Sequence, residues 1–294
     1  MIPGKFSYHA PASIPEAIAL LGEYGADAKV LAGGQSLIPL MRFRLAQPGH
    51  LVDINRIAGL SYIREDDGAL RIGPLTREAD LEAEPLIAER YPLLSDVIAV
   101  IADPLVRNLA TVCGNVAHAD PANDHPAVML AYRAEVAAEG PNGRRMIPID
   151  DFFVDTFVTA LEPDEVLVEL RIPAATPGSG GAYQKLERKV GDYAIAGVAV
   201  QLQINPAGEV TQAGIGLTNV GPMPIRAVDA ENAIVGGVPD DEAIARAADL
   251  AAAATDPVDD LRGPADYKRA VTRTLASRAL RAALARTGQN PHLR

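Results

Sequence analysis

The sequence predicts an α+β protein of two domains that meet near residue 175. First, short apolar strands and helical segments are mixed along residues 13–173. Second, residues 173–182, PAATPGSGGA, combine Gly, Pro and small side chains, which is typical of a linker or a long turn. Third, this segment is followed by two long strands and then by helices. A chain of 294 residues is long enough for two domains of ordinary size.

The first helix is predicted over residues 13–25, SIPEAIALLGEYG. Ser13 can act as its N-cap, Pro15 fits the first turn, and Glu16 completes the spacing of a capping box. Gly25 can end the helix because glycine tolerates the left-handed backbone of a C-terminal cap.

The following segments alternate between strand and helix patterns. Residues 28–36, AKVLAGGQS, read as a short strand that enters a double-glycine turn. Further along, we expect a helix over 36–45 interrupted at Pro39, a strand over 50–54, a hairpin over 60–76 that turns at Asp66, Asp67 and Gly68, helices within 76–101, an irregular loop over 111–126, a helix over 126–132, and strands over 134–140 and 165–173.

The part beyond the linker has a simpler pattern. Residues 192–220 read as two long antiparallel strands joined by the turn Asn205–Gly208. Only helices are expected after them, over 227–236, 240–255 and 263–286.

Composition excludes several classes of function. The net charge of -11 and the pI of about 4.9 disfavour nucleic acid as a partner, because an acidic surface repels phosphate backbones. No apolar run is long enough to span a bilayer, and the first residues lack a signal-peptide pattern, so we expect a cytoplasmic protein. The single Cys excludes a disulfide framework, a CxxC redox pair and an iron–sulfur cluster ligated within the chain.

The double-glycine turn Ala32–Ser36 is the first candidate binding site. Gly33 and Gly34 can take positive φ and leave their amide N–H groups free, which makes a concave site for an anion. The helix that follows adds the positive end of its dipole, and Ser36 could cap it or donate to a phosphate. The turn is neither a GxGxxG motif nor a P-loop, so a plain tight turn is the alternative.

The second candidate is TVCGNVAHADPANDHP, residues 111–126. His118, Asp120, Asp124 and His125 could be metal ligands, although their spacing matches no standard motif. A Cys113 nucleophile paired with His118 and a polar turn without a ligand are further alternatives. A cofactor loop is the fourth: its amides would hold phosphate, its hydroxyl and amide side chains a ribityl chain, and a carboxylate the hydroxyls.

The two candidates together resemble the FAD-binding medium subunit of the molybdenum hydroxylases. This family includes aerobic carbon monoxide dehydrogenase, xanthine dehydrogenase and bacterial N-heterocycle dehydrogenases. Its signatures A-G-G-x-S and T-I-G-G-N correspond to Ala32–Ser36 in KVLAGGQSLIPLM and Thr111–Asn115 in IADPLVRNLATVCGNVAHADPANDHPA. KLERKVGDYAIAGVAV and GIGLTNV resemble later family segments, so the likeness spans essentially the whole chain, and it is closest in kind to the carbon monoxide dehydrogenase medium subunit.

The resemblance implies a fold and a set of cofactor contacts. Residues 1–176 would form an FAD-binding domain of the PCMH or vanillyl-alcohol-oxidase type, with two α/β subdomains. Residues 177–294 would form a carbon monoxide dehydrogenase flavoprotein C-terminal-type domain of antiparallel sheet and helices, with FAD between the two. The implied FAD contacts are Ala32, Gly33, Gly34, Gln35, Ser36, Ile101, Thr111, Val112, Cys113, Gly114, Asn115, Asp124, Leu167, Lys185 and Tyr193.

Two of these residues depart from the family pattern. Gln35 stands where many relatives have His, and Cys113 replaces the first Gly of the second signature, where relatives can use positive φ. Four of the remaining contacts have a structural alternative. Tyr193 could be a core aromatic, Lys185 a solvated charge, and Asp124 a helix cap, while Leu167 would be buried in any strand.

The resemblance implies electron transfer, with no catalytic residue in this chain. A small subunit with 2Fe-2S clusters would deliver electrons to FAD, which passes them to an external acceptor, and a large molybdopterin subunit would oxidise the substrate. The expected assembly is a dimer of heterotrimers of the carbon monoxide or the N-heterocycle and xanthine dehydrogenase kind. One alternative is a stand-alone FAD-dependent oxidase or dehydrogenase with its own organic substrate, and another is a scaffold subunit without a cofactor.

Overall fold

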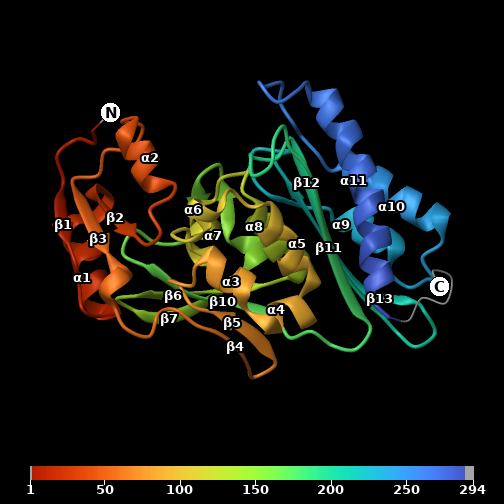
Figure 1. The fold of residues 1–294 in the computed structure, drawn as a ribbon, viewed down its shortest axis with the longest axis horizontal. Coiled ribbons are helices and arrows are strands. Elements are labelled where there is room, and N and C mark those ends of the chain that lie inside the picture. The colour runs from red at the N-terminus through yellow and green to blue at the C-terminus, as the bar shows by residue number, and fades with distance from the viewer. Residues whose placement is uncertain (1, 289–294) are drawn as a thin grey trace.

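A computed structural model describes residues 2–288, and three layers follow one another across it (Figure 1). An N-terminal lobe with a small parallel sheet comes first, then a central layer with a larger antiparallel sheet, then the C-terminal sheet and its helices. Each layer has its own core of buried apolar side chains. The predicted α+β class, with two subdomains before a C-terminal domain of antiparallel sheet and helices, is confirmed.

The N-terminal lobe is a three-stranded parallel sheet in the order β1-β3-β2. Its elements are β1 (Ser7–His9), α1 (Ile14–Tyr24), η1 (Gly25–Asp27), β2 (Ala28–Leu31), α2 (Leu37–Arg42), β3 (His50–Asp53) and η2 (Ile54–Arg56). The predicted caps of α1 are confirmed: Ser13 Oγ accepts from Glu16 N at 3.3 Å, and Gly25 ends the helix at φ 53°. The predicted capping box is only half formed, because Glu16 Oε2 accepts from Ala12 N at 2.7 Å and not from Ser13 N. Sequence inspection missed β1, which is only three residues long and largely exposed.

The predicted interruption of the second helix at Pro39 is wrong. Helix α2 runs from Leu37 to Arg42 without a break. Pro39 lies in the first turn, where a backbone N–H has no acceptor within the helix, so a missing donor costs nothing there.

The central layer is a five-stranded antiparallel sheet in the order β4-β5-β10-β6-β7, covered by helices. The strands are β4 (Ile63–Asp66), β5 (Ala69–Ile72), β6 (Glu135–Gly140), β7 (Gly143–Pro148) and β10 (Val166–Pro173), and a small hairpin of β8 (Phe153–Asp155) and β9 (Val158–Thr159) follows η3 (Ile149–Asp151). The helices are α3 (Glu78–Ala83), α4 (Pro85–Arg90), α5 (Pro92–Val100), α6 (Pro104–Arg107), α7 (Val112–His118) and α8 (Asp124–Tyr132). The predicted hairpin turn is confirmed, with Asp67 and Gly68 both at positive φ.

Residues 111–126 are not the irregular loop expected from their polar composition. Helix α7 occupies Val112–His118, and α8 begins at Asp124. Thr111 caps α7, because its Oγ1 accepts from Gly114 N at 3.2 Å. Thr111 therefore serves as a helix cap rather than as part of a loop, a role for which Thr is well suited, whereas Asn123 is the N-cap of α8 without a side-chain bond.

The C-terminal layer is a four-stranded antiparallel sheet in the order β11-β12-β13-β14. Its elements are β11 (Ser179–Leu186), β12 (Ala196–Ile204), β13 (Val210–Thr218), β14 (Ile225–Arg226), α9 (Val228–Ile234), α10 (Asp241–Ala253) and α11 (Ala265–Arg286). The two long strands and three helices are confirmed, but β11 and β14 were missed. None of the helices between residues 2 and 288 has the length and apolar character required to cross a bilayer.

Strand β11 was hidden by the glycines of the expected linker, which are there for packing. A Cβ on Gly180 would lie 2.3 Å from the carbonyl oxygen of Ala283 in α11, and one on Gly181 would lie 2.8 Å from Leu93 Cβ in α5. Glycine inside a strand allows such close approach. The same holds for Gly214 in β13, where a Cβ would lie 1.9 Å from the carbonyl oxygen of Ala131 in α8. The C-terminal sheet is thus packed against α5 and α8 on one face and α11 on the other (Figure 1).

Candidate functional site

The first glycine turn directly follows β2. Gly34 has φ 72°, in the region that favours glycine, whereas Gly33 has an ordinary φ. The amide N–H groups of residues 33–36 donate to no acceptor in the described part of the chain. Ser36 is the N-cap residue of α2, but its side chain makes no capping bond. The turn therefore presents several adjacent amide donors, the arrangement of an anion-binding nest.

The second glycine segment is the first turn of α7, and its donors are partly used already. Gly114 N donates to Thr111 Oγ1, Asn115 N donates to Thr111 O at 2.9 Å, and Val112 N donates to Thr76 O at 3.1 Å. The side-chain Oδ1 of Asn115 is buried without a partner among the described residues. The main-chain donors of the glycine turn at residues 33–36 are thus freer than those of residues 111–115.

Cys113 fits this segment because the segment is helical. Its φ is not positive, so a side chain is tolerated where relatives carry glycine. The sulfur lies 3.4 Å from the carbonyl oxygen of Gly73 and is buried, which raises the pKa of the Cys113 thiol. A buried, protonated thiol directed at carbonyl oxygens is not a nucleophile.

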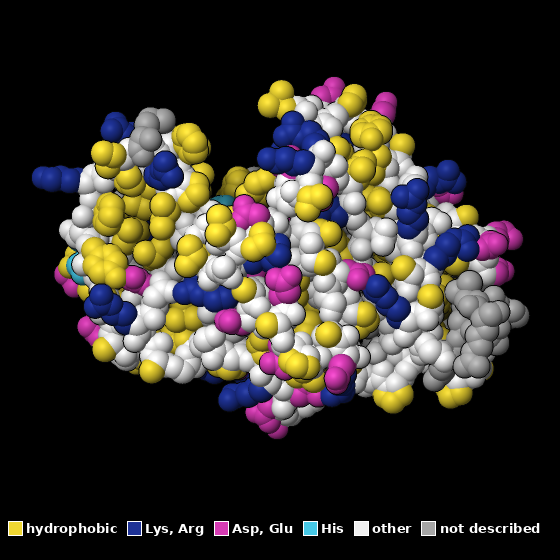
Figure 2. All heavy atoms as spheres, in the orientation of Figure 1, with side chains coloured by type: hydrophobic (Ala, Val, Ile, Leu, Met, Phe, Trp, Pro, Cys, Tyr) yellow, Lys and Arg dark blue, Asp and Glu magenta, His cyan; other side chains and the backbone are white. Residues whose placement is uncertain are grey.

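The two glycine segments are in direct contact. A Cβ on Gly33 would lie 2.4 Å from the carbonyl oxygen of Leu109 and 2.8 Å from Ala110 Cα. Only glycine allows this approach of the two backbones. Figure 2, in the orientation of Figure 1, shows that the surface is hollowed between the N-terminal lobe and the C-terminal layer, above α6, α7 and α8.

Two side chains that sequence inspection missed tie these segments together. Asn55 Nδ2 donates to the carbonyl oxygen of Ala32 at 2.8 Å, and its Oδ1 accepts from Arg77 Nη2 at 2.6 Å. Arg77 Nη1 also donates to the carbonyl oxygen of Leu109. Burial lowers the pKa of Arg77, and Asp80 and Asp53 oppose that effect. No local signal could have revealed this bridge, because its three parts lie far apart in the sequence.

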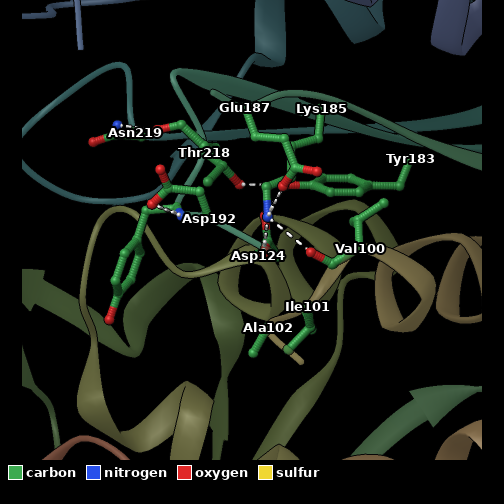
Figure 3. A network of polar contacts seen from close by, with 12 residues as sticks. Val100, Ile101, Ala102, Asp124, Tyr183, Lys185, Glu187, Asp192, Thr218 and Asn219 are labelled. Atoms are coloured by element: carbon green, nitrogen blue, oxygen red, sulfur yellow. Dashed lines mark hydrogen bonds and ion pairs between the residues drawn. The ribbon is translucent and has the colours of Figure 1, made fainter. Parts of the chain in front are cut away.

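Asp124 and Lys185 form a buried ion pair between α8 and β11 (Figure 3). Lys185 Nζ lies 2.9 Å from Asp124 Oδ2 and also donates to the carbonyl oxygen of Val100 at 3.0 Å. Tyr183 donates its hydroxyl to Asp124 Oδ1 at 2.6 Å. Burial raises the pKa of Asp124, with Lys185 acting in the opposite direction, and burial together with Asp124 raises that of Tyr183. Lys185 is therefore not a solvated charge, and the N-cap of α8 is Asn123, not Asp124.

The apolar and aromatic side chains predicted to contact FAD differ in how deeply they are buried. Ile101 and Leu167 are buried in the same core as Val112 and Cys113, beneath the second glycine segment. Tyr193, in contrast, is 44% exposed, so it is not a core aromatic. The guanidinium of Arg262 lies 5.5 Å from the centre of its ring, a cation–π distance, and burial raises the pKa of its hydroxyl.

The four residues considered as metal ligands do not converge. Asp124 is engaged by Lys185, and His125 Nε2 lies 2.8 Å from Glu78 Oε2 in a fully buried pair. The ring of His118 packs on Phe157, with centroids 5.1 Å apart, and Asp120 Oδ1 accepts from Ala122 N. Over residues 2–288, no group of three or more His, Cys, Asp or Glu side chains is arranged to hold a metal ion.

These residues suit a dinucleotide with a diphosphate at its centre. The turn at 33–36 offers unpaired amide donors against a closely packed second backbone, and this is how an acidic protein can hold phosphate with few cations. The unpartnered Asn115 amide oxygen and the half-exposed ring of Tyr193 add a polar and an aromatic group for the remaining parts of such a cofactor.

Comparison with known families agrees with this site. Residues 4–175 match the family described as the FAD binding domain in molybdopterin dehydrogenase, and residues 181–283 match the CO dehydrogenase flavoprotein C-terminal domain. The fold and the site therefore define a flavoprotein that binds FAD and serves as an oxidoreductase subunit.

Individual relatives are similar over nearly their whole length. The carbon monoxide dehydrogenase medium chain of Hydrogenophaga pseudoflava is 50% identical over 286 residues, which are 97% of this chain and 99% of that one. The chain of that name from Afipia carboxidovorans is 43% identical with the same coverage. A solved structure of carbon monoxide dehydrogenase from H. pseudoflava superimposes with a TM-score of 0.94 at 52% identity, covering 97% of this chain and 99% of that one. The chain belongs to the family of FAD-binding medium subunits of the molybdenum hydroxylases, of the carbon monoxide dehydrogenase type.

Proposed function

We propose that this chain carries electrons from a small partner subunit with 2Fe-2S clusters, through its FAD, to an external acceptor. A large molybdopterin subunit would oxidise the substrate, in a dimer of heterotrimers, and that substrate would be carbon monoxide or an N-heterocycle such as a purine. The names of the relatives support this reading, since they include carbon monoxide dehydrogenase medium chains and a subunit of a 6-hydroxypseudooxynicotine dehydrogenase complex. The single Cys is consistent with clusters that belong to another chain.

The observation that carries the proposal is the contact between Gly33 and residues 109–111. It brings the two glycine segments to one place, where the diphosphate of FAD would lie against the free amides of residues 33–36. We assign the FAD contacts to Ala32–Ser36, Thr111–Asn115, Ile101, Asp124, Leu167, Lys185 and Tyr193. When bound, FAD supplies the conversion between one-electron and two-electron transfer.

The chain's own residues would hold and shield the cofactor. The first glycine turn would bind the diphosphate, and Asn55 and Arg77 would keep the two backbones together. Tyr193 would cover part of the flavin ring, since it projects from the C-terminal layer with nearly half of its surface exposed. We further propose a domain boundary between residues 176 and 177. The boundary falls between the end of β10 at Pro173 and the start of β11 at Ser179.

Reduction of the flavin by substrate tests the electron route. In the purified complex, carbon monoxide or the matching heterocycle should bleach the visible absorption of the oxidised flavin under anaerobic conditions. In the chain separated from its partners and loaded with FAD, the same substrates should leave that absorption unchanged, while dithionite should bleach it. Direct reduction of the separated chain by an organic substrate would contradict the proposal and favour a stand-alone flavin dehydrogenase.

A further inference from the structure

The turn Val100–Asp103 has a backbone that its sequence does not favour. It follows the last residue of α5, with Ile101 at φ -81° and ψ 117° and Ala102 at φ 47°. These are the signs of a type II turn, in which the second central position favours glycine. An alanine there is strained, and such strain persists where the surroundings hold the backbone in place.

Three carbonyl groups of this turn are held by cationic side chains. Val100 O accepts from Lys185 Nζ at 3.0 Å, and Arg107 Nη1 lies 3.0 Å from Ile101 O and 3.3 Å from Ala102 O. Arg107 is itself fixed by Glu82, whose Oε2 lies 3.0 Å from Arg107 Nε. The amide N–H groups of Ala102 and Asp103, in contrast, donate to no acceptor within residues 2–288. The turn therefore directs its acceptors into the protein and keeps two adjacent donors available.

A glycine of the C-terminal layer closes the turn from the other side. Gly191 has φ 77°, and a Cβ on it would lie 2.5 Å from the carbonyl oxygen of Ala102. It precedes Asp192 and Tyr193 in the segment between β11 and β12. Val100, Ile101 and Ala102 lie beside the Asp124–Lys185 pair (Figure 3). The turn is thus clamped between Arg107 from the central layer and Lys185 and Gly191 from the C-terminal layer.

We propose that Arg107 and Gly191 are positioning residues that hold this turn against the ring end of the flavin. The free N–H groups of Ala102 and Asp103 would then donate to acceptor atoms of the isoalloxazine ring. The inference rests on the proposed placement of FAD, in which Ile101, Lys185 and Tyr193 contact the cofactor. Ile101 belongs to the turn, Lys185 donates to its Val100 carbonyl oxygen, and Tyr193, which would cover the flavin ring, comes two residues after Gly191. Arg107 and Gly191 would thus not touch the cofactor themselves but would act on it by fixing the backbone of the turn.

The test compares Gly191→Ala with Gly208→Ala in the full chain, purified with its co-purifying subunits and freed of FAD. Both glycines have φ near 80°, but Gly208 has no atom within 4 Å of a built Cβ, so it controls for backbone strain alone. Binding of FAD and of ADP is measured for each by titration. Gly191→Ala should weaken FAD binding by at least about tenfold, shift the visible spectrum of the bound flavin, and leave ADP binding unchanged. Gly208→Ala should alter neither.

Arg107→Gln provides a second variant should Gly191→Ala not fold. It removes the donors to both carbonyl groups, so it should weaken FAD but not ADP binding and shift the midpoint potential of the flavin. Arg107→Lys should restore part of both effects, and Arg144→Gln, at an exposed ion pair with Glu139, should have none. Equal loss of FAD and ADP, or no loss of FAD, in the Gly191 and Arg107 variants would overturn the inference. If Gly33→Ala bound FAD normally, the proposed FAD site itself would fail, which is a separate outcome.

Discussion

Lys185 and Asp124 form an ion pair with 2.9 Å between Nζ and Oδ2, and their side chains are only 2% and 8% exposed. The pair joins β11 of the C-terminal layer to α8 of the central layer. A buried pair is costly to break, since removing one partner leaves the other charged and desolvated. The two residues therefore couple the packing of the layers to the electrostatics of the proposed FAD site.

Replacement of Lys185 by Met should lower the free energy of unfolding by about 3–5 kcal/mol, because Asp124 is left without its counter-charge. The double variant Lys185→Met, Asp124→Asn should recover part of that loss, since the uncompensated charge is gone. Urea unfolding of the apoprotein measures both effects. Arg273→Met, at an exposed pair with Asp249, serves as the control and should change stability very little. Equal losses in the single and the double variant would show that packing, not charge, matters here.

Gly33→Ala should weaken FAD binding by at least about tenfold, because the new methyl group forces the two glycine segments apart. Gly22→Ala is the matched control. Gly22 lies inside α1 with free space around it, so alanine there should stabilise the protein by about 0.5–1 kcal/mol and leave FAD binding unchanged. The FAD content of the purified variants and a titration with FAD decide the matter, and normal binding by Gly33→Ala would refute the proposed diphosphate site.

Stability should fall as the pH drops below about 6.5, in part because of His118. Burial lowers the pKa of His118, and Asp120 opposes that effect. The unfolded chain then takes up a proton before the folded chain does, so acid favours unfolding until the folded pKa is passed. His118→Asn should make the free energy of unfolding less dependent on pH between about 7.5 and 5.5. The free energy of unfolding is measured by urea unfolding at these two pH values. If its change with pH were the same in the variant and the natural protein, His118 would titrate normally.

Cys113 should resist thiol reagents in the native protein. Burial raises the pKa of its thiol, and its sulfur faces the carbonyl oxygens of Ile72 and Gly73. Only the thiolate reacts readily, so labelling should require unfolding. Mass spectrometry after treatment with iodoacetamide, with and without urea, measures the difference. Rapid labelling of the native chain would mean that the first turn of α7 opens in solution.

Local signals in the sequence predicted those elements whose determinants lie within a few residues of one another. Ser13, Pro15 and Glu16 define the start of α1, and Asp67 and Gly68 supply the positive φ that the hairpin turn needs. The double-glycine turn was recognised for the same reason, because Gly34 alone explains its left-handed backbone. Such features depend on backbone conformation and capping, which neighbouring residues decide.

Tertiary structure decided everything that depends on contacts between distant segments. Gly180 and Gly181 looked like a linker, yet they lie in a strand because α11 and α5 pack against them. No local sequence pattern indicates the bridge of Asn55 and Arg77 or the contact of Arg107 with Ala102. The same is true of the burial of Lys185. The sequence by itself determined which backbones can turn and where helices begin. Only the packed chain decided which of those turns meet, because contact and desolvation arise from residues that are remote along the chain.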